Sequence, residues 1–280
     1  MSHVRKLFQN PPQNGLDSSP APHEAIPKIV AANSDLSNVP NVESDIQPAS
    51  RLVFHTDPRG PGADRFRFLR MRLRELANKG GLKTLLVTSP LSHDGKSTVV
   101  LNLATALSER GKHAVLVIEA DLHHSSLTRS LGLDSWAGLA ECLQGAFDPL
   151  SAIRRVEPLG WHLLPGGEPR RNPTELLQTP AFGSVMQQLS PHFEWILIDS
   201  PPAVPLTDAL SLQQHADATL LAVRAGGTPR EVVEQAVTLL GRKHILGIVL
   251  NGVEGLDRLY YKYRSYRGSA PAKAGTAEES

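Results

Sequence analysis

The sequence predicts an α/β protein with a mostly parallel sheet and helices on both of its faces. Three observations support this fold class. Short runs of apolar residues recur without polar alternation, which is typical of strands that are buried on both faces. Segments with helical spacing of apolar residues separate these runs. A Gly-Lys-Ser-Thr sequence, residues 95–98, follows the first run and opens the next helix.

The elements follow in chain order. Strands are predicted over residues 84–89, 114–120, 194–200, 218–224 and 245–251. Helices are predicted from about Asp64 to the Gly80-Gly81 pair, from Lys96 to Arg110, and from Pro229 to about Arg242. The first of these helices is amphipathic and strongly basic. Residues from about 120 to 165 form a mixed region in which no single period dominates.

A further helix start is predicted at Asn172. Asn is a preferred N-cap, Pro173 suits the first helical position, and Glu175 stands three residues after the cap. We therefore expect a capping box in which the Glu175 carboxylate accepts the backbone N–H of Asn172.

Composition predicts one domain with two tails. The chain has 280 residues, of which 40% are hydrophobic, and a formal net charge of +1. Residues 1–50 are polar and aperiodic and are expected to be disordered, residues 51–255 to form the domain, and residues 256–280 to form a flexible tail. Cys142 is the single cysteine, and neither a signal peptide nor an apolar run of about 18 residues is present. We expect a cytoplasmic location.

The chain's four tyrosines all lie in one short stretch near its C-terminus. This cluster consists of Tyr260, Tyr261, Tyr263 and Tyr266, interleaved with Lys262, Arg264 and Arg267. Aromatic side chains usually bury area in a core. Tyrosines on a basic tail therefore indicate a use of the phenol hydroxyl.

A phosphate site is predicted where the first strand meets the second helix. A strand, a tight loop and Gly95-Lys96-Ser97 at a helix start direct backbone N–H groups and an ammonium toward one point, which suits a nucleoside triphosphate. Lys96 would contact the β and γ phosphates and Ser97 would hold Mg²⁺. Pro90 stands where the first glycine of the G-x-x-x-x-G-K-[ST] pattern belongs. An ordinary helix N-cap is the alternative.

Three acids end apolar strands beside this loop. Asp199 ends the strand at 194–200, a position from which phosphate-loop proteins hold the water shell of the metal. Glu119 and Asp121 end the strand at 114–120. We expect Asp121 and Asp199 to join Ser97 at the metal. Solvated loop acids are the alternative for each. A transition-metal site at Asp121, His123 and His124 is disfavoured, because neither cysteine nor further spaced histidines support it.

These pieces together resemble the bacterial tyrosine kinases of capsule and exopolysaccharide synthesis, which are P-loop ATPases. The resemblance covers about residues 50–267 and rests on five segments: VTSPLSHDGKSTVVLNLA, VLVIEADLHHSSL, LLPGGEPRRNPTELL, WILIDSPPAVPLTDA, and VLNGV followed by the tyrosine cluster. It implies a P-loop NTPase fold, ATP and Mg²⁺ as cofactors, and phosphorylation of the four tyrosines.

The resemblance also assigns further residues. It implies that His93, Asp94, Gly95, Lys96, Ser97, Thr98 and Asn251 bind the nucleotide, with Asn251 at the adenine edge. It implies that Asp64, Arg67 and Arg70 pack subunits into a ring. Its partners would be copies of the chain itself, a separate membrane activator of the polysaccharide chain-length class that recruits the protein to the inner face of the membrane, and a tyrosine phosphatase.

The second acidic motif departs from the family pattern. The family usually has Asp-x-Asp-x-Arg, and here the positions are Glu119, Asp121 and His123. Glu adds a methylene, and loss of the Arg removes a fixed fork of donors. His93 replaces a small loop residue and is expected to crowd the phosphates. These changes are compatible with reduced or partner-dependent activity.

Three functions compete. In the favoured one, the protein transfers phosphate from ATP to tail tyrosines of a neighbouring subunit, with Asp121 or Glu119 as proton acceptor and Lys96 and Asp199 at the phosphates. The second is a switch ATPase of the partitioning type, whose signature lysine would stand at Leu91. The third is a nucleic-acid-binding module that uses the basic tyrosine tail. The net charge of +1 does not favour nucleic acid.

Overall fold

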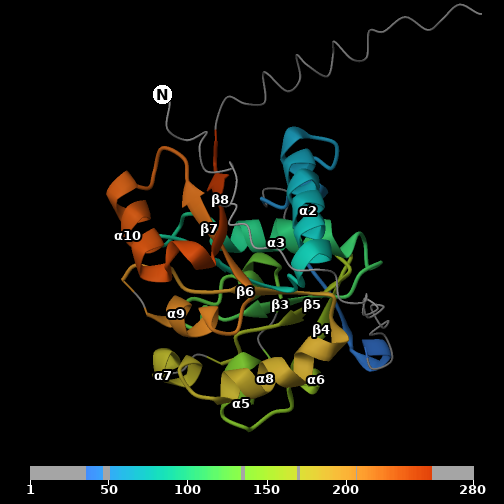
Figure 1. Ribbon diagram of the computed structural model, residues 1–280. Helices are drawn as coiled ribbons and strands as arrows, with labels where there is room; N and C mark the ends of the chain where they lie inside the picture. The colour runs from blue at the N-terminus through green and yellow to red at the C-terminus, as the bar shows by residue number, and fades with distance from the viewer. Residues whose placement is uncertain (1–35, 47–50, 134–135, 169–170, 206, 254–280) are drawn as a thin grey trace, which may run out of the picture. The chain divides into compact units, whose positions relative to one another are not determined.

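An eight-stranded sheet forms the centre of the protein in the computed structural model, which describes residues 36–46, 51–133, 136–168, 171–205 and 207–253 (Figure 1). The strand order is β1-β4-β5-β3-β6-β2-β7-β8. All neighbouring pairs are parallel except β4 and β5. The strands are β1 (Asn41–Glu43), β2 (Thr84–Thr88), β3 (Val115–Glu119), β4 (Arg154–Glu157), β5 (Trp161–Leu164), β6 (Trp195–Asp199), β7 (Ala218–Arg224) and β8 (Ile245–Asn251).

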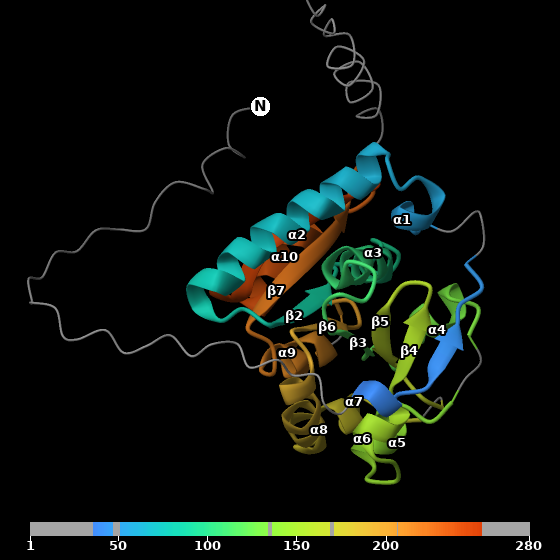
Figure 2. The ribbon, with the colours of Figure 1, turned by 90° about the vertical axis from the view of Figure 1, so that its right-hand side faces the viewer.

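Helices cover both faces of this sheet. The described helices are α1 (Val53–Thr56), α2 (Pro61–Gly80), α3 (Lys96–Ser108), α4 (Leu127–Ser130), α5 (Leu139–Leu143), α6 (Pro149–Ala152), α7 (Pro173–Leu177), α8 (Ala181–Leu189), α9 (Asp208–Gln213) and α10 (Arg230–Leu240), with short 3₁₀ turns at Leu36–Asn38, Ser190–His192 and Arg242–His244. Helices α1 to α3 lie on one side of the sheet and α5 to α8 on the other (Figure 2).

Alternate residues of β2, an interior strand, pack against these two layers of helices. Leu85 and Val87 of β2 pack in the core beneath α2 and α3, whereas Leu86 packs in the core shared with α5 to α9. A third, smaller core joins β7 to α9 and α10. The predicted mostly parallel α/β fold is confirmed. A strand that is buried on both faces must be apolar throughout, which explains why the apolar runs predicted it.

The structure corrects two predictions of local structure. Residues 41–43, within the segment expected to be disordered, form β1, whose backbone pairs in parallel with β4. The mixed region contains β4 and β5 as well as three short helices. Helix α7 begins at Pro173 as predicted, but the Asn172 cap makes no side-chain bond to the backbone. Its amide instead donates to the Glu175 carboxylate, with 3.0 Å between the two atoms, so the capping box is absent.

Several predictions concern residues outside the described ranges. Residues 1–35 and the tyrosine cluster at 260–266 lie there, so the proposed tails remain predictions. Cys142 is buried and carries no disulfide. Across the part of the chain that the structure describes, none of the helices combines the length and apolar character needed to cross a membrane.

Candidate active site

The loop between β2 and α3 has the geometry of a phosphate cradle. Gly95 precedes α3 with a φ of 93°, and a side chain there would collide with the amide of Asn251. Only glycine adopts this backbone readily while leaving space for a neighbouring strand. The helix therefore starts at Lys96 with its first N–H groups available for an anion.

Asp94 fastens this loop to two other segments. Its carboxylate accepts hydrogen bonds from the Leu91 N–H at 3.0 Å and the Thr228 hydroxyl at 2.7 Å, and its carbonyl accepts one from the Asn251 amide at 3.1 Å. Asp94, predicted to bind nucleotide, thus shapes the loop. Asn251, predicted to meet the adenine, lies against the same loop at the end of β8. Of the other predicted loop residues, His93 is exposed, with a φ of 68°, and Thr98 is half-buried in the first turn of α3.

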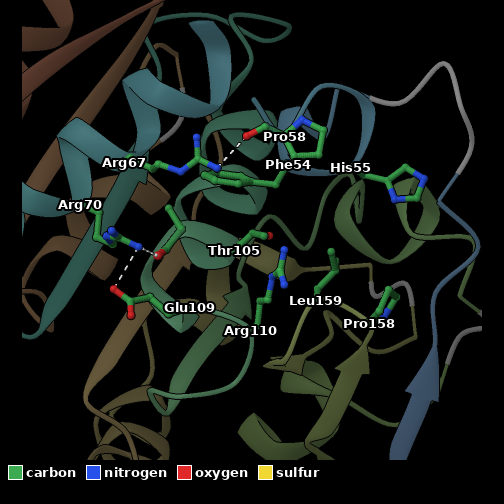
Figure 3. A pocket seen from close by; sticks show the side chains of 11 residues that line it. Phe54, His55, Pro58, Arg67, Arg70, Thr105, Glu109, Arg110, Pro158 and Leu159 are labelled. Carbon is green, nitrogen blue, oxygen red and sulfur yellow. Dashed lines mark hydrogen bonds and ion pairs between the residues drawn. The ribbon is translucent and has the colours of Figure 1, made fainter. Parts of the chain in front are cut away.

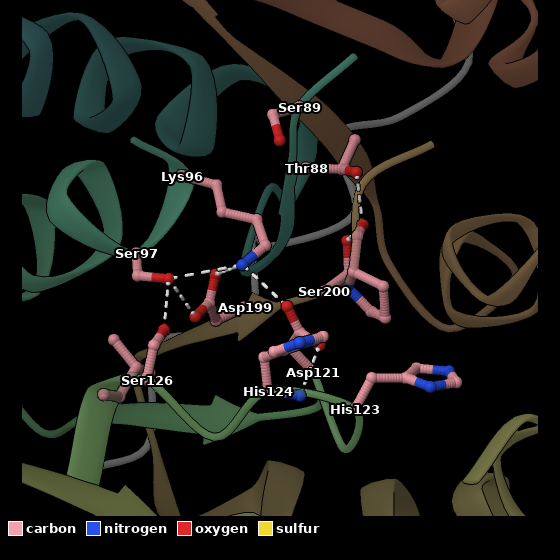
Figure 4. Close-up of polar contacts among 12 residues, drawn as sticks. Thr88, Ser89, Lys96, Ser97, Asp121, His123, His124, Ser126, Asp199 and Ser200 are labelled. Atoms are coloured by element: carbon pink, nitrogen blue, oxygen red, sulfur yellow. Dashed lines mark hydrogen bonds and ion pairs between the residues drawn. The ribbon is translucent and has the colours of Figure 1, made fainter. Parts of the chain in front are cut away.

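The structure brings four predicted residues together at the carboxyl ends of β3 and β6. Lys96 Nζ lies 2.8 Å from Asp121 Oδ2 and 4.0 Å from Asp199 Oδ1 (Figure 4). The Ser97 hydroxyl donates to Asp199 Oδ2 at 2.8 Å. Residues from α3, β6 and the loop after β3 therefore converge on one point, where parallel α/β sheets bind their ligands.

Burial sets the charges of this cluster. Asp199 is fully buried, and burial raises the pKa of its carboxyl to about 7, although Lys96 and the Ser97 hydroxyl act in the opposite direction. Burial alone would lower the pKa of Lys96, but the carboxylates of Asp199 and Asp121 outweigh it and raise that pKa. Lys96 is therefore an ammonium held between two acids.

One oxygen of Asp199 fits a place in a magnesium water shell. Within the described ranges, Oδ1 of Asp199 is buried with no hydrogen-bond partner, since Lys96 at 4.0 Å is too distant. A buried acceptor without a donor is costly unless a ligand or water satisfies it. Together with the Ser97 hydroxyl, this oxygen matches the donor set that P-loop proteins use for Mg²⁺.

Glu119 does not have the free carboxylate that the sequence prediction required. Its Oε1 accepts the Leu127 N–H at 2.7 Å and the Thr128 N–H at 3.4 Å, and its Oε2 accepts the Thr128 hydroxyl at 2.6 Å and the Gly166 N–H at 3.1 Å. The side chain is fully buried. Four donors occupy its oxygens and join Glu119 to the start of α4 and the loop after β5, so these contacts do not favour the predicted role as proton acceptor.

His123 also leads away from the cluster. Its Nε2 lies 2.8 Å from Oδ2 of the buried Asp208, at the start of α9, and 3.4 Å from the Thr174 hydroxyl of α7. Its ring points away from Lys96 (Figure 4). The histidine that replaces the family arginine therefore ties the loop of Asp121 to α7 and α9.

Sequence reasoning missed two residues, one that contacts the site and one that contacts His123. The Ser126 hydroxyl lies 2.9 Å from that of Ser97, and Asp208 holds His123. Ser126 directly precedes α4, and serine is a preferred N-cap residue. A helix start predicted there, after the strand at 114–120, would have pointed to it. Asp208 stands in the TDA sequence that follows β6, yet only the fold shows its partner.

The predicted ring residues interact within the chain. Arg67 binds Asp64 and the carbonyl of Pro58, each at 2.7 Å. Arg70 lies 3.0 Å from Glu109 and donates to the carbonyl of Ala106. These contacts hold both guanidinium groups against other segments of the same chain, and their role between subunits stays a prediction.

The chain is similar to a described family and to several known proteins. A family model described as cellulose biosynthesis protein BcsQ matches residues 88–249. The tyrosine-protein kinase CpsD of Streptococcus agalactiae is 30% identical over 66% of this chain and 81% of its own length. The tyrosine-protein kinase ptk of Acinetobacter johnsonii is 32% identical over 60% of this chain and 22% of its own length. The crystal structure of the chimerical protein CapA2B2 has a TM-score of 0.69 and 25% identity, over 78% of this chain and 96% of that chain. This chain spans less than a third of the length of the first curated relatives that it matches.

Proposed function

The chain belongs to the family that the BcsQ model describes and to the bacterial tyrosine-protein kinases, and we propose that it transfers the γ-phosphoryl group of ATP to tyrosine. The observation that carries this proposal is the convergence of Lys96, Ser97, Asp121 and Asp199 within hydrogen-bond and ion-pair distances. These groups supply positioning and charge neutralisation, which phosphoryl transfer requires.

Each residue has a distinct role in this step. The α3 N-terminus and Lys96 would bind the β and γ phosphates, and Ser97 and Asp199 would hold Mg²⁺. When bound, Mg²⁺ neutralises charge on the phosphates. The tyrosine oxygen attacks the γ phosphorus, the bond from that phosphorus to the bridging oxygen breaks, and ADP leaves with the electron pair. Asp121 accepts the phenol proton, whose pKa near 10 makes an acceptor necessary.

Asp121 forms an ion pair with Lys96, with 2.8 Å between the two atoms. The phosphates offer Lys96 a partner of higher charge, so nucleotide binding releases the Asp121 carboxylate for the phenol. This exchange replaces the role that the sequence prediction shared between Asp121 and Glu119.

The proposed substrate is the tyrosine cluster of a neighbouring copy. Lys262, Arg264 and Arg267 would guide Tyr260, Tyr261, Tyr263 and Tyr266 toward a site that contains phosphates and two acids. Each phosphate adds a charge of about −1.5 to −2 and reverses this attraction. Phosphorylation would then release the tail from the site.

We further propose that this activity regulates synthesis or export of exopolysaccharide or capsule. The family model's description, which concerns cellulose biosynthesis, supports a polysaccharide pathway. A ring of copies packed through Asp64, Arg67 and Arg70, a membrane activator that recruits the protein to the inner face of the membrane, and a tyrosine phosphatase complete the proposal on the strength of the family resemblance.

Mass spectrometry after incubation with Mg·ATP tests the proposal, both without and with a candidate membrane activator. We expect phosphate on residues 260–266 and none in the Lys96→Met variant. A Lys96-dependent ATPase activity that never marks tyrosine, even with the activator present, would instead identify a switch ATPase.

A further inference from the structure

A cavity lies outside the proposed nucleotide site, between α1, α2, the turn after α3 and the connection from β4 to β5. Its volume is about 360 Å³, within the range of roughly 300–1,000 Å³ that is usual for small-ligand pockets. No residue of the phosphate loop lines it. Its wall combines basic and apolar side chains, which include Phe54, Arg67, Arg70, Arg110, Pro158 and Leu159 (Figure 3).

A strained turn presents Arg110 to this cavity. Glu109, Arg110 and Gly111 have successive φ values of 47°, 63° and 81°, so two residues with side chains adopt the left-handed region. Such residues are strained and persist where their surroundings fix them. Gly160 packs closely against this turn, because a side chain on it would collide with the backbone of Arg110 and Gly111. The side chain of Arg110 points into the cavity between Thr105 and Leu159 (Figure 3).

Arg110 carries a positive charge that its neighbours leave available. Neither an ion pair nor a side-chain hydrogen bond joins it to another residue in the described ranges. Elsewhere around the cavity, Glu109 binds both Arg70 at 3.0 Å and Arg74 at 2.7 Å, and Arg67 binds Asp64. Cations therefore outnumber carboxylates here, and an anionic ligand is favoured.

The apolar part of the wall favours a ligand whose anionic group is attached to an apolar ring. The Arg67 guanidinium lies over the Phe54 ring, 5.2 Å from its centroid, which leaves Phe54 held at the cavity wall by a cation. Pro158 and Leu159 line the cavity opposite (Figure 3). An aromatic ring can pack between these surfaces while an anionic group on it reaches Arg110.

We propose that this cavity binds phosphotyrosine, presented by the C-terminal tail after phosphorylation. The inference rests on the proposed function for the origin of its ligand, although binding itself requires no kinase activity. Phosphate takes charge-assisted hydrogen bonds from a guanidinium fork, and the phenyl ring accounts for the apolar wall. The cavity is thus a receptor for the reaction product, separate from the site that makes it.

Charge makes this receptor selective for the modified tail. Residues 257–267 contain four basic residues and one acid, so the unmodified segment has the same sign as the cavity. A phosphate of about −1.5 to −2 supplies an opposite charge at the aromatic ring. Arg67 and Arg70 also belong to the predicted ring helix, so an occupied cavity would change the surface that α2 offers to another copy.

The test is binding of a synthetic peptide of residues 257–267, phosphorylated on Tyr263, to the full-length Asp121→Asn protein. Saturating Mg·ADP keeps the phosphate loop filled, because this variant is expected to retain its affinity for ADP, and the substitution suppresses phosphoryl transfer. We expect the phosphorylated peptide to bind and its unphosphorylated form to bind at least tenfold more weakly. Arg110→Asn, which suits the left-handed backbone, should weaken binding of the phosphopeptide by about ten- to a hundredfold.

Lys112→Asn is the matched control, because it removes the same charge two residues away from an exposed side chain outside the cavity wall. It should retain wild-type affinity, and thermal melting establishes that both variants fold. Equal binding of the two peptide forms, an unchanged affinity in folded Arg110→Asn, or inorganic phosphate binding as tightly as the phosphopeptide would each overturn the proposal. Phenyl phosphate separates recognition of the aryl phosphate from recognition of the peptide sequence. A kinase that fails to mark tyrosine would leave these measurements unaffected.

Discussion

Lys96 Nζ lies 2.8 Å from Asp121 Oδ2, so the cation of the phosphate loop and the acid after β3 form an ion pair. The two side chains are mostly buried and come from different elements. If nucleotide binding separates them, Lys96 would contact the phosphates and Asp121 would accept the phenol proton. Variants of the two residues should therefore fail in different ways.

Asp121→Asn should lower the rate of transfer to tyrosine by about 10²–10⁴-fold, because a neutral amide cannot accept the phenol proton. Its affinity for ADP should stay close to that of the wild type, whereas Lys96→Met should lose affinity and transfer together. Single-turnover assays with radiolabelled ATP and titration with a fluorescent ADP measure the two quantities. Transfer within about threefold of the wild-type rate in Asp121→Asn would exclude Asp121 as the acceptor.

Glu119→Gln should lower the free energy of unfolding by about 1–3 kcal/mol, because its amide NH₂ faces N–H donors that the carboxylate now satisfies. Urea unfolding measures this change. We expect activity to fall only in proportion to the loss of folded protein. A fully stable Glu119→Gln that has lost transfer would restore Glu119 to a catalytic role.

The sequence predicted the strands that are apolar throughout, and missed those that are not. β4 has the sequence RRVE and β1 has only three residues, so neither shows the apolar run or the regular alternation that marks a strand. Both form because neighbouring backbone provides hydrogen bonds. β1, for example, pairs with β4 across more than a hundred residues of chain.

The sequence likewise predicted one part of the site and missed another. Lys96, Ser97, Asp121 and Asp199 were predicted together because their motifs end strands that share one edge of the sheet. Glu119 has the same sequence context as Asp121, yet its donors come from Thr128 and Gly166, in segments that the fold brings close. Strand position therefore predicted which acids gather, but their hydrogen-bond partners required the structure.

His123→Ala should lower the free energy of unfolding by about 1–3 kcal/mol, because it removes a partner of the fully buried Asp208. Oδ1 of Asp208 already has no hydrogen-bond partner in the part of the chain described, which makes loss of the contact at Oδ2 costly. His124→Ala is the matched control. Its exposed imidazole makes neither a hydrogen bond nor an ion pair with a described residue, so we expect a change within about 0.5 kcal/mol. Equal stability of the two variants in urea unfolding would contradict this role of His123.

A fourth prediction concerns the pH dependence of stability. Burial lowers the pKa of the His162 imidazole from 6.5 to about 4, so this ring stays neutral in the folded core beside Phe193. Between these two pH values the unfolded chain binds a proton at this residue and the folded chain does not. The free energy of unfolding should therefore rise with pH through this window. The pKa of Asp199 is raised from 3.8 to about 7, so its contribution to the free energy of unfolding falls with pH. The two contributions oppose each other in the pH profile of the whole protein.

His162→Leu should isolate the histidine contribution, since it removes the titrating ring and leaves Asp199 in place. From about pH 5 to about pH 7.5, the free energy of unfolding of the wild type should increase by about 2 kcal/mol more than that of His162→Leu, because most of the pKa difference lies in this interval. Urea unfolding of both proteins at the two pH values gives this difference directly, independent of the stability that the substitution itself changes. Parallel pH profiles would show that His162 titrates alike in the folded and unfolded chains.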